Sequence, residues 1–226
     1  MSTVTPVDGA IVVGVDGSES ATRAVRWAAK LAASRGIALH LVHGFGVVAG
    51  RADAEPSPDS FLGSMKRQGF SLLTEAEKVV TDAHDDLVAT TSLRNEPPIT
   101  VLKKLSRSAH MIVLGSSGLG GFEGMLLGST AVAVVSYARC PVVVVRGREE
   151  IPADSPVVVG IDGSPVTERA IAAAFDEAAR LEVGLVAVHA WSDTSYDSVF
   201  GTSPLFIYTD SPADNERQVL TESLAG

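Results

Sequence analysis

An internal repeat is the feature that most constrains how this chain can fold. The segment 13–18, Val-Gly-Val-Asp-Gly-Ser, recurs 146 residues later at 159–164 as Val-Gly-Ile-Asp-Gly-Ser. Further identical residues keep the same offset without a gap, namely Arg23 and Arg169, Leu39 and Leu185, Val42 and Val188, and His43 and His189. A constant offset over this distance indicates a tandem duplication. It leaves 80 of the 226 residues for the second copy, which is therefore expected to be incomplete.

The repeat predicts two domains of unequal size. We expect a complete domain over residues 1–146, a charged and proline-containing linker over 147–156, and a truncated second copy over 157–226. Truncation of a longer protein is the preferred explanation for the short second copy. Without the later strands of the first copy, the second one exposes sheet edges and apolar surface that a neighbour must cover.

Strands and helices alternate along the first copy. Apolar residues make up 46% of the chain and aromatic residues 5%, a balance typical of buried parallel strands beneath alanine-rich helices. The expected strands are 10–15, 37–43, 88–93, 111–115 and 141–146, and the expected helices are 21–34, 61–87, 97–109 and 129–138. In the second copy we expect strands at 157–161 and 184–190 and helices at 166–181 and 213–224. Right-handed crossovers then give a doubly wound parallel α/β sheet, whose ligands bind beyond the carboxyl ends of the strands.

Charge and composition exclude several classes of function. The formal net charge of −9 disfavours binding to nucleic acid or to an anionic membrane. No apolar secretory segment opens the chain, and its most apolar long run, 131–145, is interrupted by Arg139 and too short to span a bilayer. Cys140 is the sole cysteine, so one chain cannot form an internal disulfide or a metal site of several cysteines. We expect a cytoplasmic protein.

A glycine-rich segment after the fourth expected strand carries the main signal for ligand binding. Gly115-Ser116-Ser117-Gly118 is followed, after nine residues, by Gly128-Ser129-Thr130 at the start of a helix. Unpaired amide groups and the positive end of the helix dipole attract phosphate there, while glycine lets the backbone approach the ligand closely. No lysine follows Gly128, so this is not a Walker A loop, and Glu123 replaces the last glycine of a dinucleotide-binding fingerprint.

Two further positions lie at the same edge of the expected sheet. Asp16 follows the first strand, where its carboxylate could hold a ribose hydroxyl or, through water, a divalent cation. An Asx turn with Gly17 that caps the next helix is an equally weighted interpretation. Val42, near the end of the second strand, could offer its backbone to an adenine edge while its side chain packs on the ring, or simply belong to the core.

The sequence shows no catalytic constellation. His43 and His189 occupy equivalent positions in the two copies, but no converging ligand spacing accompanies them, so partly buried strand-end histidines are the favoured interpretation. Ser116 and Ser117 lack an identifiable neighbouring base, and no nucleophile elbow occurs. We therefore assign no catalytic residue and no protein-built metal site.

These motifs are similar to those of the universal stress protein family in its tandem form. The family motif G-x2-G-x9-G-[ST] is matched by Gly115, Gly118, Gly128 and Ser129, and the segment 13–18 resembles the family's opening strand and acidic turn. The resemblance implies a Rossmann-like sheet of order 3-2-1-4-5. It implies ATP, often with Mg²⁺, at a site made of Val15, Asp16, Gly17, Ser18, Val42, Gly115, Ser116, Gly118, Gly128, Ser129 and Thr130. It also implies stress regulation with little or no turnover, and dimerisation or domain pairing through the last strand, 141–145.

Two residues depart from the family pattern. Relatives commonly carry Arg where this chain has Ser117 and often Asp where it has His110, which weakens the expected charge compensation of phosphate. The second copy has no glycine cluster, so one ATP per chain is expected. A weak ATP hydrolase or adenylyl-transfer enzyme is the alternative to a regulator, and a scaffold that no longer binds ligand is a third hypothesis.

Overall fold

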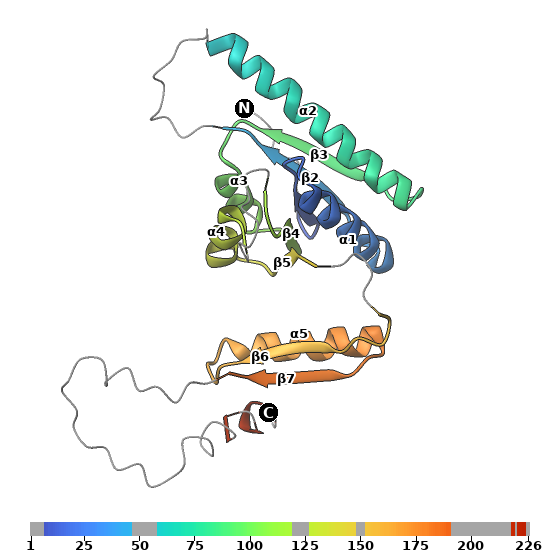
Figure 1. Ribbon diagram of the computed structural model, residues 1–226, viewed down its shortest axis with the longest axis vertical. Coiled ribbons are helices and arrows are strands. Elements are labelled where there is room, and N and C mark those ends of the chain that lie inside the picture. Colours follow the sequence, from blue (N-terminus) through green and yellow to red (C-terminus); the bar gives the residue numbers. More distant parts are fainter. Residues whose placement is uncertain are drawn as a thin grey trace, which may run out of the picture. The chain divides into compact units, whose positions relative to one another are not determined.

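The computed structural model describes residues 7–46, 58–118, 127–147, 152–190, 218–219 and 221–224. The chain divides into two compact units, Met1–Glu149 and Glu150–Gly226. The first unit contains β1 (Ile11–Gly14), α1 (Glu19–Arg35), β2 (Leu39–Gly44), α2 (Pro58–Ala83), β3 (Ala89–Arg94), α3 (Pro98–Leu105), β4 (Met111–Gly115), α4 (Ser129–Tyr137) and β5 (Val142–Val145). All strand pairs are parallel and the sheet order is β3-β2-β1-β4-β5, so the predicted α/β sheet and its order are confirmed (Figure 1).

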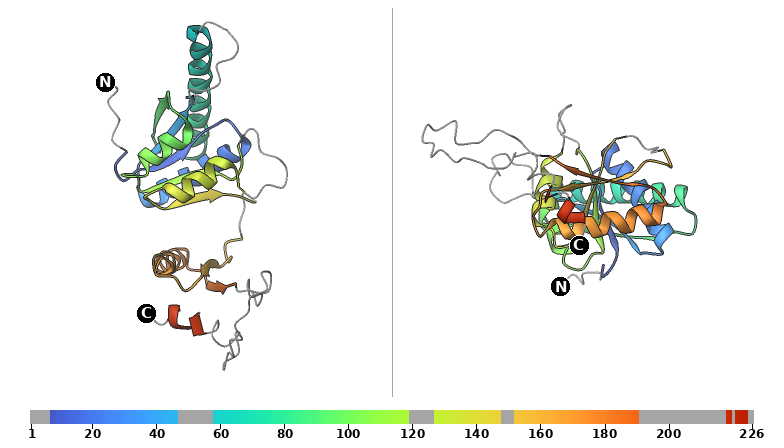
Figure 2. Two further views of the ribbon diagram at one scale, coloured as in Figure 1. Left: turned by 90° about the vertical axis from the view of Figure 1, so that its left-hand side faces the viewer. Right: turned by 90° about the horizontal axis from the view of Figure 1, so that it is seen from below.

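The sheet is covered on both faces because side chains of a strand alternate between them. Helices α1 and α2 pack on one face, and α3 and α4 pack on the other (Figure 2). On the first face Ile11 and Val13 of β1 lie beneath the alanines of α1, and on the second Val12 lies with Val101 and Leu102 of α3. Both faces of the three central strands, β1, β2 and β4, are therefore largely buried, whereas β3 and β5 at the edges are only partly buried.

Helix boundaries differ from expectation where side chains set the cap. Helix α1 begins two residues before the expected 21 because the Ser18 hydroxyl accepts the N–H of Ala21 at 3.1 Å. Helix α3 ends at Leu105, four residues before the expected 109. The next residue, Ser106, is buried and its hydroxyl accepts the N–H of Arg139 at 3.1 Å, which joins the end of α3 to the segment between α4 and β5.

The second unit repeats the opening of the first. It contains β6 (Val157–Ile161), α5 (Thr167–Leu181) and β7 (Leu185–His189), and β6 pairs with β7 in parallel. The register agrees with that of the first unit, since Val157 faces Leu185 as Ile11 faces Leu39. Residues 218–219 and 221–224 are helical, and the rest of the helix expected over 213–224 lies outside the described residues.

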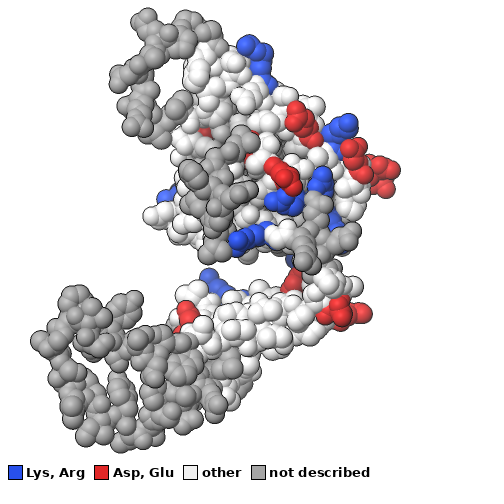
Figure 3. All heavy atoms as spheres, in the orientation of Figure 1, with Lys and Arg blue, Asp and Glu red and all other residues white. Residues whose placement is uncertain are grey.

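On the face of the molecule drawn in Figure 3, positive and negative side chains do not form separate patches. Lys and Arg alternate there with Asp and Glu over the first unit. No helix in the described part of the chain combines the length and apolar character needed to cross a bilayer. The lone Cys140 is partly buried, and burial raises the pKa of its thiol, as expected for a packing residue.

A histidine is completely buried within the sheet. His40 of β2 has 0% exposure, and its two ring nitrogens each lie 2.8 Å from a hydroxyl, Thr90 Oγ1 on one side and Ser92 Oγ on the other. Burial, assisted by the positive charge of Arg94, lowers the pKa of His40 from 6.5 to about 4. Between pH 6.5 and about 4 the imidazole of His40 is therefore neutral in the folded protein and protonated in the unfolded chain.

We expect this histidine to make stability depend on pH. Between pH 6.5 and about 4 the unfolded chain binds a proton at His40 that the folded chain does not, so stability falls as the pH is lowered through this window. The loss reaches at most about 3 kcal/mol at 1.36 kcal/mol per pKa unit. Urea unfolding of wild type and His40→Gln at several pH values measures it. The wild type should lose stability relative to the variant below pH 6.5, and parallel curves would contradict the assignment.

We also expect Gly17 and Gly36 to tolerate a side chain differently. Both have positive φ, 85° and 63°, but a Cβ on Gly17 would lie 2.5 Å from Leu72 Cδ2 of α2, whereas a Cβ on Gly36 would meet nothing within 4 Å. Gly36→Ala should thus cost about 1 kcal/mol of backbone strain, and Gly17→Ala the same strain plus the cost of displacing the end of the Leu72 side chain. Denaturant unfolding compares the two variants, and an equal loss would show that Gly17 does not pack against α2 as described.

Candidate functional site

A cavity of about 420 Å³ lies where β1, β2 and β4 end. This is the switch point of the sheet, because β2 and β4 lie on opposite sides of β1. The cavity is lined by 18 residues of five segments, which are Gly14, Val15, Asp16 and Ala21, then Val42, His43 and Gly44, then Pro98, Val101 and Leu102, then Leu114, Gly115, Ser117 and Gly118, and finally Gly128, Ser129, Thr130 and Ala131. The three segments selected from the sequence therefore meet in one place.

Asp16 makes the Asx turn and lines the cavity at the same time. Its Oδ1 accepts the N–H of Ser18 at 2.9 Å. Its Oδ2 lies on the side of the glycine turn, since a Cβ on Gly118 would be 2.8 Å from it. The two interpretations of Asp16 are thus compatible, because one oxygen shapes the turn and the other faces the cavity. The side chain that caps α1 is Ser18 rather than Asp16.

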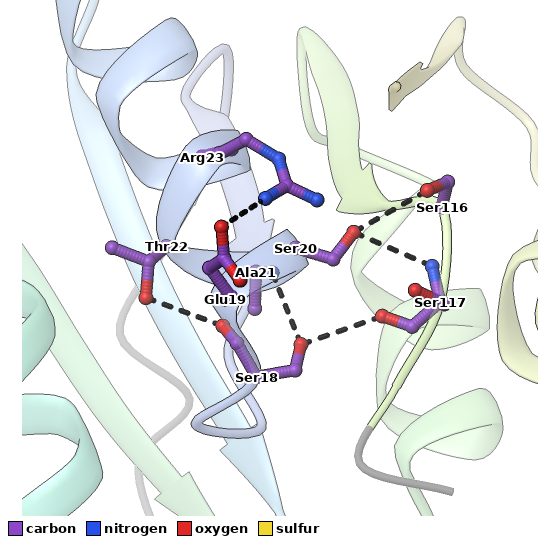
Figure 4. A network of polar contacts seen from close by, with 8 residues as sticks. All are labelled: Ser18, Glu19, Ser20, Ala21, Thr22, Arg23, Ser116 and Ser117. Carbon is purple, nitrogen blue, oxygen red and sulfur yellow. Dashed lines mark hydrogen bonds and ion pairs between the residues drawn. The ribbon is translucent and has the colours of Figure 1, made fainter. Parts of the chain in front are cut away.

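Serine hydroxyls join the start of α1 to the glycine turn (Figure 4). Ser18 Oγ donates to the carbonyl of Ser117 at 3.3 Å. Ser20 Oγ accepts the N–H of Ser117 at 3.4 Å and lies 3.4 Å from Ser116 Oγ. Ser20 could not be selected from the sequence, because its partners lie 96 and 97 residues away in the chain. These bonds hold the backbone of the turn in place beside the cavity.

The turn itself needs glycine because the backbone packs so closely. A Cβ on Gly115 would lie 2.6 Å from the backbone carbon of Ser20, so no side chain fits there. The N–H of Gly128 donates to the carbonyl of Ser116 at 2.7 Å, which closes the two ends of the loop on each other. Glu123 lies outside the described residues.

The N-terminus of α4 opens on the same cavity. Gly128 provides no side-chain cap, and the first turn of α4 carries no acidic residue. The first amide groups of a helix have no acceptor within the helix, and they carry the positive end of its dipole. Ser129 and Thr130 add hydroxyl groups next to them. This arrangement suits an anionic group of the size of phosphate.

Three predicted site residues support the site without lining it. Gly17 packs against Leu72 of α2, Ser18 caps α1, and Ser116 is buried against Ser20. In contrast, Pro98, Val101 and Leu102 of α3 form an apolar wall that the sequence did not reveal. The 3.6-residue period identifies the buried face of a helix but not the cavity at its end, so no local signal could have selected them.

Val42 and His43 occupy the end of β2. The carbonyl of Val42 already accepts the N–H of Val15 at 2.9 Å, and its side chain is buried among Val101 and Leu102. His43 Nδ1 lies 2.6 Å from the carbonyl of Val15, so His43 joins the ends of β1 and β2. The same bond recurs in the second unit between His189 Nδ1 and the carbonyl of Ile161, also at 2.6 Å.

The second unit has the same acidic turn, but its carboxylate, that of Asp162, makes an additional hydrogen bond. Asp162 Oδ1 accepts the N–H of Ser164 at 2.9 Å, as Asp16 accepts that of Ser18. Asp162 additionally accepts the hydroxyl of Thr167, and the hydrogen bonds from Thr167 and Ser164 lower its pKa to about 2. Thr167 stands where the first copy has Ala21. Among the described residues, the second unit has no strand besides β6 and β7.

The predicted pairing strand lies at an edge of the sheet. In the described part of the chain β5 pairs with β4 alone. Beside it, α4 exposes Val132, Val135 and Tyr137 to between 49% and 60%. Both features are compatible with the expected self-association through 141–145, which stays a prediction.

Comparison with known proteins extends the resemblance to the universal stress protein family from the motifs to nearly the whole chain. The model of the universal stress protein family matches residues 9–146 and 155–223. A universal stress protein of Mycolicibacterium smegmatis is 38% identical over 221 residues, which cover 96% of this chain and 74% of that protein. Universal stress protein Rv2623 of Mycobacterium tuberculosis is 38% identical over 230 residues, covering 96% and 73%.

A solved structure gives the same fold. The crystal structure of a universal stress protein from Archaeoglobus fulgidus superposes with a TM-score of 0.62 at 20% identity, covering 84% of this chain and 70% of that one. With the family model matching both copies, and with relatives 38% identical over 96% of the sequence, the chain belongs to the universal stress protein family.

Proposed function

We propose that the first unit binds ATP and that the chain acts as a nucleotide-dependent regulator in a stress response, with little or no catalysis. The observation that carries the proposal is the single cavity into which Asp16, Val42, the glycine turn and the start of α4 converge. Its volume of about 420 Å³ lies within the range of small-molecule sites. A few charge-assisted hydrogen bonds suffice for the ~8 kcal/mol of a micromolar complex.

Each part of the nucleotide has a suitable counterpart in the lining. The side chains of Val42, Val101 and Leu102 offer an apolar surface to the base. The Oδ2 atom of Asp16 can accept a ribose hydroxyl. The backbone of Gly115–Gly118 and the first amides of α4 are left for the phosphates, which is the division of roles typical of nucleotide sites at a switch point.

The same residues fit a Mg²⁺ ion carried by the nucleotide. Mg²⁺ prefers oxygen ligands and usually keeps several waters, binding through one or two carboxylates together with substrate phosphates. The hydroxyls of Ser129 and Thr130 provide oxygens at the phosphate end of the cavity, and the Asp16 carboxylate, as the alternative to its ribose contact, would hold the ion through water. Within the described residues no group of three or more His, Cys, Asp or Glu could hold a metal ion alone. When bound, Mg²⁺ would neutralise phosphate charge.

The contacts of the titratable groups in the cavity support binding without turnover. Among the described lining residues, Asp16 and His43 carry the side chains of the types used as general acids or bases. Asp16 is engaged by the amide of Ser18, and His43 Nδ1 by the carbonyl of Val15. Neither is positioned by a third group against a serine, as a nucleophilic mechanism needs. The proposed role is therefore a cytoplasmic sensor of nucleotide, with pairing through 141–145 as its route of assembly.

We expect Gly118→Val to abolish nucleotide binding without unfolding the protein. Its Cβ would lie 2.8 Å from the end of the Asp16 side chain, which can move aside into the cavity at the expense of the ligand. Gly184→Val is the matched control, since a Cβ at Gly184 meets nothing within 4 Å. Calorimetric titration with Mg²⁺-ATP should show at least a tenfold loss of affinity for Gly118→Val alone. Unaltered binding in that variant would contradict the proposed site.

We expect one nucleotide per chain, bound through the first acidic turn. Asp16→Ala removes a charged hydrogen-bond acceptor from the cavity and should weaken binding about tenfold to a hundredfold. Asp162→Ala, the equivalent change in the second unit, should leave affinity and stoichiometry unaltered, because that carboxylate is engaged by Thr167 and Ser164. Calorimetry of both variants measures this. Two equivalent sites in the wild type, or equal effects of the two substitutions, would disprove the assignment to the first unit.

A further inference from the structure

The described lining of the cavity lacks a basic side chain of the lysine or arginine type. Of its 18 residues, Asp16 is the sole carboxylate, and the remainder are apolar, glycine, hydroxyl or the His43 ring. In the sequence, residues 108–138 contain neither Lys nor Arg. Among the described lining residues, phosphate would therefore meet amide and hydroxyl donors, the positive end of the α4 dipole and the Asp16 carboxylate, but no side chain with a full positive charge of the lysine or arginine type.

Basic residues of the neighbouring helices are engaged elsewhere. Lys104 of α3 forms an ion pair with Glu96. Lys103 lies over the ring of Tyr137, 4.8 Å from its centre. Arg23 of α1 is paired with Glu19 at 2.7 Å. None of these three residues is among the described residues that line the cavity.

We propose that this site selects adenine nucleotides by the net charge of their phosphates, accepting Mg²⁺-ATP and AMP and discriminating against free ATP. The proposal rests on the adenine-nucleotide function proposed above and specifies the ligand form. Neutral amide and hydroxyl donors stabilise a phosphate oxygen but do not neutralise a polyanion. The Asp16 carboxylate and the overall charge of −9 oppose each further negative charge brought into the cavity. Mg²⁺ complexation or loss of phosphates removes that repulsion.

The change of affinity with salt concentration shows whether the site attracts or repels the charge of free ATP. A basic phosphate site loses affinity as salt screens its attraction for the ligand. In this cavity salt screens a repulsion, so affinity for free ATP should rise or stay level with increasing salt. The direction of the salt dependence therefore separates a site without basic residues from a conventional one.

Ser117 is the position at which the missing charge can be added. Its backbone makes the hydrogen bonds to Ser18 and Ser20, so a new side chain leaves those bonds in place. Ser117→Arg introduces a guanidinium group at the cavity wall, and Ser117→Gln is the matched control of similar length without charge. The arginine variant should bind free ATP about tenfold more tightly than wild type and lose that gain at high salt, whereas the glutamine variant should not gain.

Calorimetry of the full chain at pH 8, above the ordinary pKa of histidine side chains, tests the proposal. The ligands are ATP with EDTA, ATP with Mg²⁺, and AMP, each at low and high salt. Wild type should bind Mg²⁺-ATP and AMP at least about tenfold more tightly than free ATP. Equal affinity for free and Mg²⁺-bound ATP, or affinity for free ATP that falls with salt, would overturn the charge selection while the nucleotide function stands. Absence of binding by all three ligands would overturn both. The wild-type titrations decide the matter even if the arginine variant fails to fold.

Discussion

The site depends on one constraint of the sheet, which is that the chain leaves the neighbouring strands β1 and β4 toward opposite faces. From β1 the chain continues into α1 on one face of the sheet, whereas from β4 it continues into α4 on the opposite face. The segments that follow β1 and β4 therefore leave the sheet toward different faces, and a gap opens between them. Because crossovers of parallel strands are right-handed, this gap follows from the strand order and does not require special loops.

Hydrogen bonds from one helix start fix the shape of that gap. Ser18 and Ser20 belong to the cap and first turn of α1, yet both contact the backbone of Ser117 on the other side of the sheet's switch point. The close approach of Gly115 to Ser20 keeps the two segments together. The start of α1 thus positions the turn toward which the amide groups of α4 are directed, so helix capping and site geometry depend on the same few residues.

Much of the fold was predictable from the sequence. Apolar periodicity identifies single strands and helices from neighbouring residues, and the repeat divides the chain into its two units. Strand β4 and strand β6 have the expected bounds, and the order of the five strands agrees with the family resemblance. The site was predictable only in part. Gly118 and Ser129, which were selected from the sequence, line the cavity, but the α3 wall and the Ser20 bonds arise from tertiary packing between segments far apart in the chain. The shorter α3 likewise reflects the buried contact of Ser106 with Arg139, which local propensity does not contain.

The duplicated acidic turn has a practical consequence. Two carboxylates, Asp16 and Asp162, share the same local bond to an amide two residues ahead, and two histidines, His43 and His189, share the same bond to a strand-end carbonyl. Features common to both copies serve the architecture of the strand ends, whereas Ala21 in place of Thr167 and the glycine turn are particular to the first. The second copy can therefore serve as a control for the first within the same polypeptide. A spectroscopic label placed specifically on His43 and His189 would report two groups with the same hydrogen bond, and a change confined to His43 on addition of nucleotide would report the ligand rather than the fold.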